Sequence, residues 1–203
     1  MPDLTSIPAS QGVQEALGQD AAVSSEAALI ARAQQYDAEA LSELYETFYP
    51  RVYHYFSIQM GDAFLAEDMA SDVMLQVLES IEKYRIQGSP FAAWVFRIAR
   101  NRLIDHQRRK ARRPHVELED NLPSLGDGPQ TIAERSMEQA SVRAALGHLT
   151  DEQRQVIVLK FMEGLDNATV ATVLGRSLGA VKSLQHRALG AMRKVLEREG
   201  LNA

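Results

Sequence analysis

Between residues 97 and 113 the sequence gathers eight basic side chains against a single acidic one, Asp105. A run of like charge on one segment is self-repelling, and a polyanion relieves that repulsion. A second basic stretch, residues 176–198, has six basic side chains against Glu197. Both stretches favour ionic contact with phosphate groups, although a solvated basic face would have the same composition.

A small residue, a glycine and an apolar residue follow one another at Ala171, Gly175 and Val181. A helix-turn-helix needs a small side chain where its helices cross, a glycine that reaches the left-handed conformation in the turn, and an apolar side chain that locks the second helix. The spacing predicts this motif, with Ser177 capping the second helix. An ordinary helical hairpin with a charged outer face is the alternative.

The second helix of this motif is expected to bury Val181, Leu184, Ala188 and Leu189 on one side. In a helix-turn-helix the N-terminal end of the second helix enters the major groove of DNA. The residues that we assign to this contact are polar, small or basic: Arg176, Ser177, Gly179, Ala180, Lys182, Ser183, His186 and Arg187.

A patch of the opposite sign is predicted on an earlier helix. Asp68 and Asp72 lie at positions i and i+4, Leu75 follows on the same side, and Glu79 lies two turns on. Carboxylates at this spacing gain nothing within their own helix, so the pattern favours a basic partner with an apolar element at its centre. A solvated acidic face is the alternative.

Few residues of the sequence could catalyse a reaction. It contains no cysteine, its five histidines are scattered, and it has no glycine-rich phosphate loop. Asp68 and Asp72 have no histidine near them in sequence, which makes them a poor metal or acid–base pair. We therefore predict that the protein is not an enzyme and uses no metal and no cofactor.

The N-terminal sequence lacks the basic start and apolar stretch of a signal peptide, and no later run approaches the roughly 20 apolar residues of a membrane span. These features predict a soluble, cytoplasmic protein that does not insert into membranes. Few residues follow the second basic stretch, so no further C-terminal domain is expected.

Helical periodicity without strand-like alternation predicts an all-α fold of two small domains. Residues 1–25 are expected to be a flexible N-terminal extension, and residues 26–113 a helical domain. Residues 114–131, rich in proline, glycine and acidic side chains, are expected to be a flexible linker. Residues 132–203 would form a second domain that carries the helix-turn-helix.

Local signals predict where individual helices begin. Asp37 can cap a helix, and a second helix after Gly61 is expected to bury Phe64 among other apolar side chains. Ser89 as cap and Pro90 at the first helical position predict the start of the basic helix. The aromatic residues between 48 and 56 are interpreted as core rather than as a stacking platform.

Together these features resemble regions two and four of bacterial sigma factors of the compact extracytoplasmic-function class. The stretch from Asp37 to Arg113, with LSELYETFYPRVYHYF, AEDMASDVML and SPFAAWVFRIARNRLIDHQRRKARRP, resembles region two. The stretch from Leu146 to Leu196, with LTDEQRQVIVLKFMEGL and GAVKSLQHRALGAMRKVL, resembles region four.

The resemblance implies a factor that binds core RNA polymerase and promoter DNA, is monomeric when free, and could have an anti-sigma factor as a third partner. Asp68, Asp72 and Leu75 would dock on polymerase, the helix from Ser177 would read the −35 element, and the acidic linker would thread channels of polymerase. A loop from Tyr84 would capture a base flipped out of the −10 element. The implied −10 contacts are Tyr84, Gln87, Ser89, Trp94, Arg97, Arg100, Asn101 and Arg108.

The sequence departs from the family pattern at several positions. Ser71, Asp72 and Met74 stand where glutamine, glutamate and an aromatic residue are usual, and Leu184-Gln185 replaces an arginine-leucine pair. The competing hypothesis is an operator-binding regulator with an N-terminal sensing domain. That hypothesis requires a ligand pocket or a dimer interface in residues 26–113, where the sequence has a basic helix instead.

Overall fold

The computed structural model describes residues 25–85, 89–112 and 141–198, and every regular element in these ranges is helical. The predicted N-terminal extension, apart from its last residue, and the predicted linker lie outside the described residues. Residues 25–33 and 141–147 are helical. The other elements are α2 (Ala38–Met60), α3 (Ala63–Ser80), η1 (Ile81–Lys83), α4 (Phe91–Arg112), α6 (Asp151–Ile157), η2 (Val158–Met162), α7 (Asn167–Leu174) and α8 (Leu178–Arg198).

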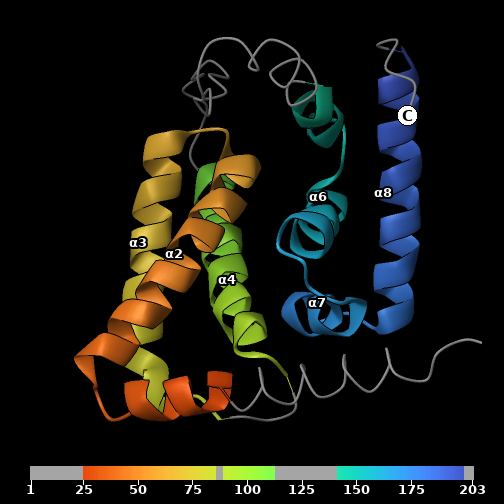
Figure 1. Ribbon diagram of the computed structural model, residues 1–203. Helices are drawn as coiled ribbons and strands as arrows, with labels where there is room; N and C mark the ends of the chain where they lie inside the picture. The colour runs from red at the N-terminus through yellow and green to blue at the C-terminus, as the bar shows by residue number, and fades with distance from the viewer. Residues whose placement is uncertain (1–24, 86–88, 113–140, 199–203) are drawn as a thin grey trace, which may run out of the picture.

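Helices α2, α3 and α4 form the N-terminal half (Figure 1). The predicted cap at Asp37 is confirmed, because its carboxylate accepts hydrogen bonds from the backbone of Glu39 and Ala40 at 3.0 and 3.1 Å. α2 ends at Gly61, whose φ of 70° is left-handed. α4 begins at Phe91, one residue later than predicted.

Aromatic side chains from α2 and α4 meet in the core of this half. Phe48, Tyr55 and Phe56 of α2 are buried against Phe91 and Phe96 of α4, which confirms that these three belong to the core. Tyr49 and Tyr53 are only partly buried against it. The prediction for Phe64 is wrong, because this side chain is 83% exposed. Phe64 is the second residue of α3, and it lies on the side of that helix that faces solvent.

The helix-turn-helix prediction is confirmed in the C-terminal half. Ala171 and Val181 are buried between α7 and α8, and Gly175 in the turn has a φ of 60°. Ser177 Oγ accepts a hydrogen bond from the Ala180 backbone at 3.2 Å. The prediction for Leu189 is wrong: it is 43% exposed, whereas the neighbouring Ala188 is buried against Leu149 and Ile157, so Leu189 lies on a side of α8 that α6 and α7 do not cover.

Asp166 caps α7 by accepting a 2.6 Å hydrogen bond from the Thr169 backbone. We expect Asp166→Ala to lower the free energy of unfolding by about 1 kcal/mol. The bond from the Thr169 N–H lowers the pKa of the Asp166 carboxyl. The cap therefore stabilises the fold fully above the unfolded-state pKa, and this stabilisation is lost as pH falls through the lower folded-state pKa.

Urea unfolding at neutral and acidic pH measures both effects of the Asp166 substitution. Asp166→Asn is the control, because it keeps the accepting oxygen but cannot titrate, so it should retain most of the stability with a weaker pH dependence. Equal stability of Asp166→Ala and the unsubstituted protein at neutral pH would contradict the capping role.

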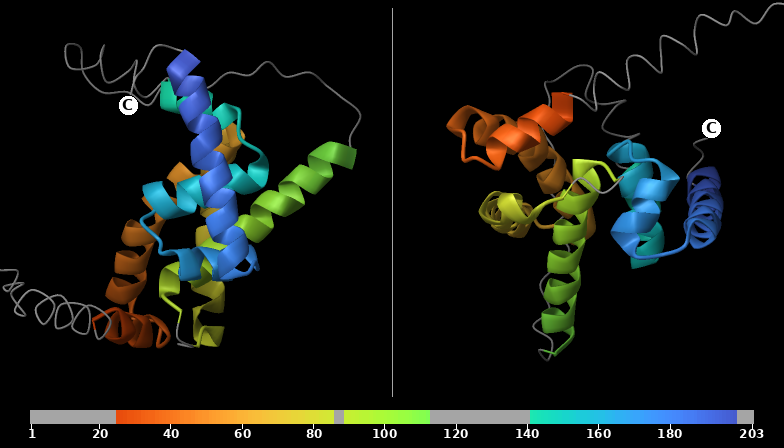
Figure 2. Two further views of the ribbon diagram at one scale, coloured as in Figure 1. Left: turned by 90° about the vertical axis from the view of Figure 1, so that its right-hand side faces the viewer. Right: turned by 90° about the horizontal axis from the view of Figure 1, so that it is seen from below.

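The two halves pack against each other and share one hydrophobic core. α7 packs against α4 (Figures 1 and 2). The buried cluster continues from Phe96 of the N-terminal half to Val170 and Leu174 of the C-terminal half. The helix-turn-helix is thereby held beside the helix that carries the first basic stretch.

Candidate nucleic-acid interface

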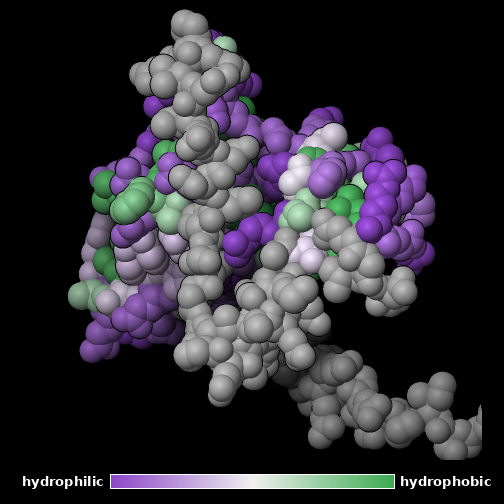
Figure 3. All heavy atoms as spheres, turned by 90° about the horizontal axis from the view of Figure 1, so that it is seen from above, coloured by the Kyte–Doolittle hydropathy of each residue, from purple (hydrophilic) through white to green (hydrophobic). Residues whose placement is uncertain are grey.

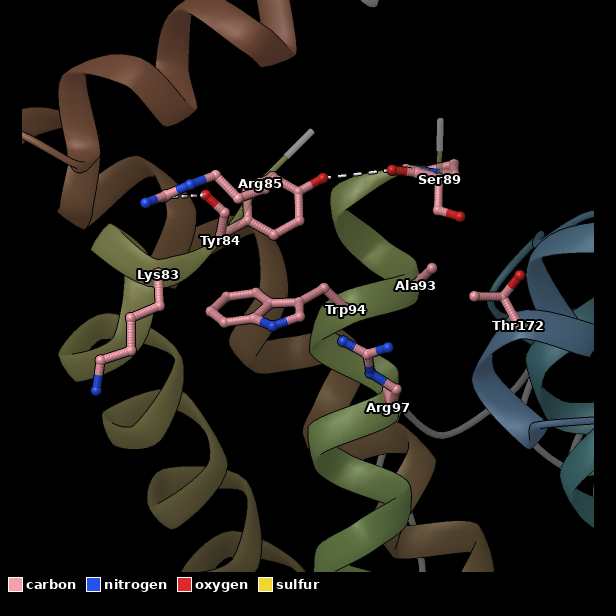
Figure 4. A pocket seen from close by; sticks show the side chains of 9 residues that line it. Lys83, Tyr84, Arg85, Ser89, Ala93, Trp94, Arg97 and Thr172 are labelled. Atoms are coloured by element: carbon pink, nitrogen blue, oxygen red, sulfur yellow. Dashed lines mark hydrogen bonds between the residues drawn. The ribbon is translucent and has the colours of Figure 1, made fainter. Parts of the chain in front are cut away.

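A cavity of about 290 Å³ opens where α4 begins. Its lining combines aromatic, cationic and hydroxyl-bearing side chains, and Figure 4 shows Thr172 of α7 on the side opposite Tyr84. Flat aromatic rings with nearby cations suit a base and its phosphate. The lining residues are Lys83, Tyr84, Arg85, Ser89, Pro90, Ala93, Trp94, Arg97 and Thr172.

The rings of Tyr84 and Trp94 line this cavity, and the buried ring of Phe91 packs against both of them. The Tyr84 ring lies 5.0 Å from Phe91 and 5.2 Å from Trp94, measured between ring centroids. Phe91 is fully buried and also contacts Phe48 edge-on at 5.2 Å, so the two lining rings are anchored in the core. The Tyr84 hydroxyl donates a 3.3 Å hydrogen bond to the Ser89 carbonyl (Figure 4), which ties together the two ends of the predicted base-capturing loop.

Gln34 supports the same loop from the turn between the helical segment 25–33 and α2. Its amide donates hydrogen bonds to the carbonyls of Ile81 and Tyr84 at 3.0 and 2.8 Å. The sequence analysis missed Gln34, because its partners are about fifty positions away in the sequence and no local pattern indicates the contact. Gln87, which was predicted to line the loop, lies outside the described residues.

The basic helix α4 does not present all its predicted contacts together. Arg97, Asn101 and Arg108 are exposed, and Arg97 lines the cavity. Arg100 is partly buried, and its Nε is enclosed without a hydrogen-bond partner in the described part of the chain. Burial lowers the pKa of His106, and the neighbouring cations lower it further, which reflects the positive potential along this helix.

The predicted −35 contacts are brought together on the outer side of the helix-turn-helix. Lys182, Ser183, His186 and Arg187 are exposed at the start of α8, as are Ser177 and Gly179, while Ala180 is half-buried. Arg176 forms an ion pair with Glu152 at the beginning of α6. Most of this surface is therefore open to a ligand.

The acidic face of α3 is exposed and more apolar than the sequence analysis predicted. Asp68 and Asp72 are open to solvent, Leu75 is 56% exposed, and the exposed Phe64 lies one turn before Asp68. Figure 3 shows apolar groups among polar ones at the left edge of the molecule, the side where α3 lies in Figure 1.

An ion pair also joins α3 to the basic helix, since Arg102 of α4 pairs with Asp72. Phe64 lies four positions before Asp68, a spacing that puts both residues on the same face of α3. The sequence analysis predicted that Phe64 is buried because its side chain is apolar. Phe64 is therefore a candidate contact residue that the sequence analysis assigned wrongly.

Within the described ranges, no three histidine, aspartate or glutamate side chains are grouped so that they could hold a metal ion. In the same ranges, none of the helices has the length and apolar character needed to cross a bilayer. The functional features of the described surface are the two basic regions, the cavity at the start of α4 and the acidic-apolar face of α3.

Two family profiles match the sequence. Sigma-70 region 2 matches residues 44–113, and Sigma-70 region 4 matches residues 139–192. The fold and both matched regions define the class as a sigma-70-type transcription initiation factor.

Curated relatives identify the class more closely. The sequence is 34% identical over 180 residues to the ECF RNA polymerase sigma factor ShbA of Streptomyces griseus. This alignment covers 84% of this chain and 94% of ShbA. It is 32% identical over 170 residues to the ECF sigma factor BldN of Streptomyces coelicolor, covering 83% of this chain and 64% of BldN. The chain belongs to the ECF RNA polymerase sigma factors, non-enzymatic proteins that direct promoter-specific transcription initiation, and not to the operator-binding regulators.

Two solved structures share the fold. CnrH in complex with the cytosolic domain of CnrY aligns with a TM-score of 0.66 at 24% identity, covering 85% of this chain and 97% of CnrH. RpoE of Bartonella quintana, in complex with the anti-sigma factor NepR, aligns with a TM-score of 0.65 at 22% identity, covering 77% of this chain and 96% of RpoE.

Proposed function

We propose that the cavity at the start of α4 captures a base extruded from the −10 element. The observation that carries this proposal is the pair of aromatic rings, Tyr84 and Trp94, that line the cavity with Arg97 beside them. Unstacking a base costs a few kcal/mol, and stacking on aromatic rings returns about 1–3 kcal/mol per base. Capture can therefore offset strand opening without ATP, while exposed Asn101 and Arg108 hold the opened strand.

The acidic-apolar face of α3 is proposed to dock on core RNA polymerase. Its apolar centre of Phe64 and Leu75, flanked by Asp68 and Asp72, is suited to a basic partner with an apolar element. Asp72 already pairs with Arg102, so docking exchanges this exposed ion pair for contacts with polymerase.

The start of α8 is proposed to read the −35 element through the major groove. We expect Lys182→Ala and Arg187→Ala each to weaken binding to promoter duplex by about 1 kcal/mol or more. If the contacts are to phosphate, each substitution should also reduce the salt dependence of binding. A salt titration with the full chain measures both effects.

Lys194→Ala, an exposed cation near the other end of α8, is the matched control for the −35 substitutions. It should leave the affinity nearly unchanged. Unchanged affinity and an unchanged salt slope in both Lys182→Ala and Arg187→Ala would remove these side chains from the DNA contact.

We further propose that the protein acts in the cytoplasm, where core polymerase and promoter DNA are found, and that a cytoplasmic anti-sigma protein is a third partner. The structural relative RpoE is seen in complex with the anti-sigma factor NepR, and CnrH is seen in complex with the cytosolic domain of CnrY. Purification of the tagged chain from its own cells, with identification of the bound proteins, tests this assignment.

In vitro transcription with core polymerase, followed by genome-wide mapping of the start sites, tests the proposed promoter contacts as a set. Recurrent sequence elements should emerge near −10 and −35. Substitutions on α8 should alter preference only at −35, and substitutions around the cavity only at −10. Altered preference at the opposite element would overturn the assignments.

A further inference from the structure

The corner between the helical segment 25–33 and α2 is held rigid by several hydrogen bonds. The Tyr36 N–H donates to the Ala33 carbonyl at 3.0 Å, and the Asp37 N–H donates to the Arg32 carbonyl at 3.3 Å. This pair of bonds closes a Schellman motif at the end of a helix. The Arg32 guanidinium also donates to the Asp37 carboxylate at 2.9 and 3.1 Å. Because the same carboxylate caps α2, the corner is fixed at both ends.

Tyr36 occupies the position of this motif that glycine usually holds. Its φ of 60° is left-handed, and in the described ranges no other residue except glycine has a positive φ. A side chain with a β-carbon is disfavoured in this conformation. Tyr36 is 58% exposed, so burial in the core does not offset the strain. A strained residue at the surface indicates a functional constraint rather than a packing one.

The Tyr36 side chain reaches the segment that follows α3. Its hydroxyl donates a 3.3 Å hydrogen bond to the carboxylate of Glu82, which lies in η1. Two residues further on, Tyr84 ends η1 and lines the cavity. The strained corner and the cavity are therefore joined through η1.

Gln34 of the same corner fixes the backbone that carries Tyr84. Tyr84 has an extended conformation at the end of η1, so its carbonyl has no helical partner. The Gln34 amide donates to this carbonyl at 2.8 Å and to the Ile81 carbonyl at 3.0 Å. One side chain thereby holds both ends of η1 in a fixed relation.

The helical segment 25–33 also affects the Tyr84 side chain. Burial raises the pKa of the Tyr84 hydroxyl, and the charge of Glu26 raises it further. The hydroxyl therefore keeps its proton at neutral pH and donates it to the Ser89 carbonyl (Figure 4). The backbone and the ring of Tyr84 are thus held by separate hydrogen bonds.

We propose that Gln34 and Tyr36 are positioning residues for base capture: they hold residues 81–85 so that the Tyr84 ring is in place to receive the extruded base. This inference rests on the proposed assignment of the cavity to −10 DNA. Neither residue lines the cavity, so both act through Tyr84. Their contribution is preorganisation, which raises affinity because less conformational freedom is lost when the base enters.

Gln34→Met tests the inference in the full chain, since it keeps the length of the side chain and removes both donors. Trp94, the only tryptophan, reports the geometry of the cavity, because its ring centroid lies 5.2 Å from that of Tyr84. We expect acrylamide to quench Trp94 fluorescence more strongly in Gln34→Met than in the parent protein. Gln35→Met, the same substitution at the neighbouring exposed position, is the matched control and should leave the quenching unchanged.

Base capture itself is measured by transcription with core polymerase from a mapped promoter whose −10 element is pre-opened. Gln34→Met should reduce transcription roughly tenfold, because two hydrogen bonds are lost. The same template is then prepared with an abasic nucleotide at each −10 position in turn. At the position of the extruded base, Gln34→Met and the parent should transcribe equally, because neither has a base to capture. A tenfold loss that persists on that template would overturn the positioning role.

Tyr36→Gly separates positioning from stability. Glycine adopts the left-handed conformation without strain, so the melting temperature should equal or exceed that of the parent. Transcription from the pre-opened template should nevertheless fall about twofold, because the bond to Glu82 is lost. Tyr36→Phe should show the same loss of transcription without any gain in stability. A role in folding alone would change stability and transcription in the same direction.

The possible failures are distinguishable. If no abasic position lowers transcription by the parent, the cavity does not capture a base, and the proposed function and this inference both fail. If such a position exists but Gln34→Met transcribes as the parent does, only the positioning role fails. Unchanged quenching of Trp94 in Gln34→Met would also overturn it. Circular dichroism monitors folding, and the two Tyr36 variants decide the question if Gln34→Met does not fold.

Discussion

Replacing Asp68 and Asp72 together by lysine should weaken binding to core RNA polymerase by at least roughly a hundredfold, because four units of charge change on a face that meets a basic partner. Both side chains are exposed, and the only described ion pair that is lost is the exposed one with Arg102, so the fold should be retained. Pull-down with core polymerase, together with circular dichroism, measures the two effects.

A control with the same change of charge is available on α2. Glu43 and Glu46 are exposed and lie one turn apart, and their double replacement by lysine should leave polymerase binding nearly unchanged. Phe64→Ala is expected to weaken binding without any change of charge. Normal polymerase binding by the folded Asp68→Lys, Asp72→Lys variant would show that α3 is not the docking face.

The second large effect is expected at the −10 cavity. Arg97→Ala should reduce transcription from duplex promoters roughly tenfold or more, because Arg97 lines the cavity that holds the extruded base. A template with a pre-opened −10 bubble should not restore activity, since base capture is still impaired. The affinity of the closed complex should barely change.

Asn101→Ala should behave differently on the same templates. Asn101 is exposed on α4 but does not line the cavity, so its contribution is to holding the opened strand. The pre-opened bubble should therefore rescue this variant. Arg109→Ala, an exposed cation about 18 Å along α4 from Arg97, controls for the loss of positive charge in Arg97→Ala.

Thermal unfolding distinguishes these functional effects from structural ones. Lower melting temperatures of Arg97→Ala and Asn101→Ala would mean that the two side chains brace α4 beside Trp94. If both variants melt as the parent does and transcribe normally from duplex promoters, the cavity and this face of α4 do not serve the −10 element.

Local sequence signals determined much of the secondary structure. Asp37 and Thr150 cap their helices, with a complete capping box at Thr150, and Gly175 takes the left-handed conformation in the helix-turn-helix. These features depend on residues within one or two turns of each other, so the sequence pattern carries the necessary information. The separation of basic and acidic stretches can also be read directly from the sequence, because it depends only on which residue types occur at which positions.

Only the tertiary structure decided which helix faces are covered. Phe64 is exposed although it is apolar, and Arg100 is partly enclosed although it was assigned to the −10 contacts. Periodicity gives the angle of a side chain around its own helix axis, but it does not say which neighbouring helix packs there. The contact between Arg51 and Glu163 spans 112 positions and joins two halves that the sequence presents as separate domains. Its partners meet only when α2 and the turn after η2 pack together.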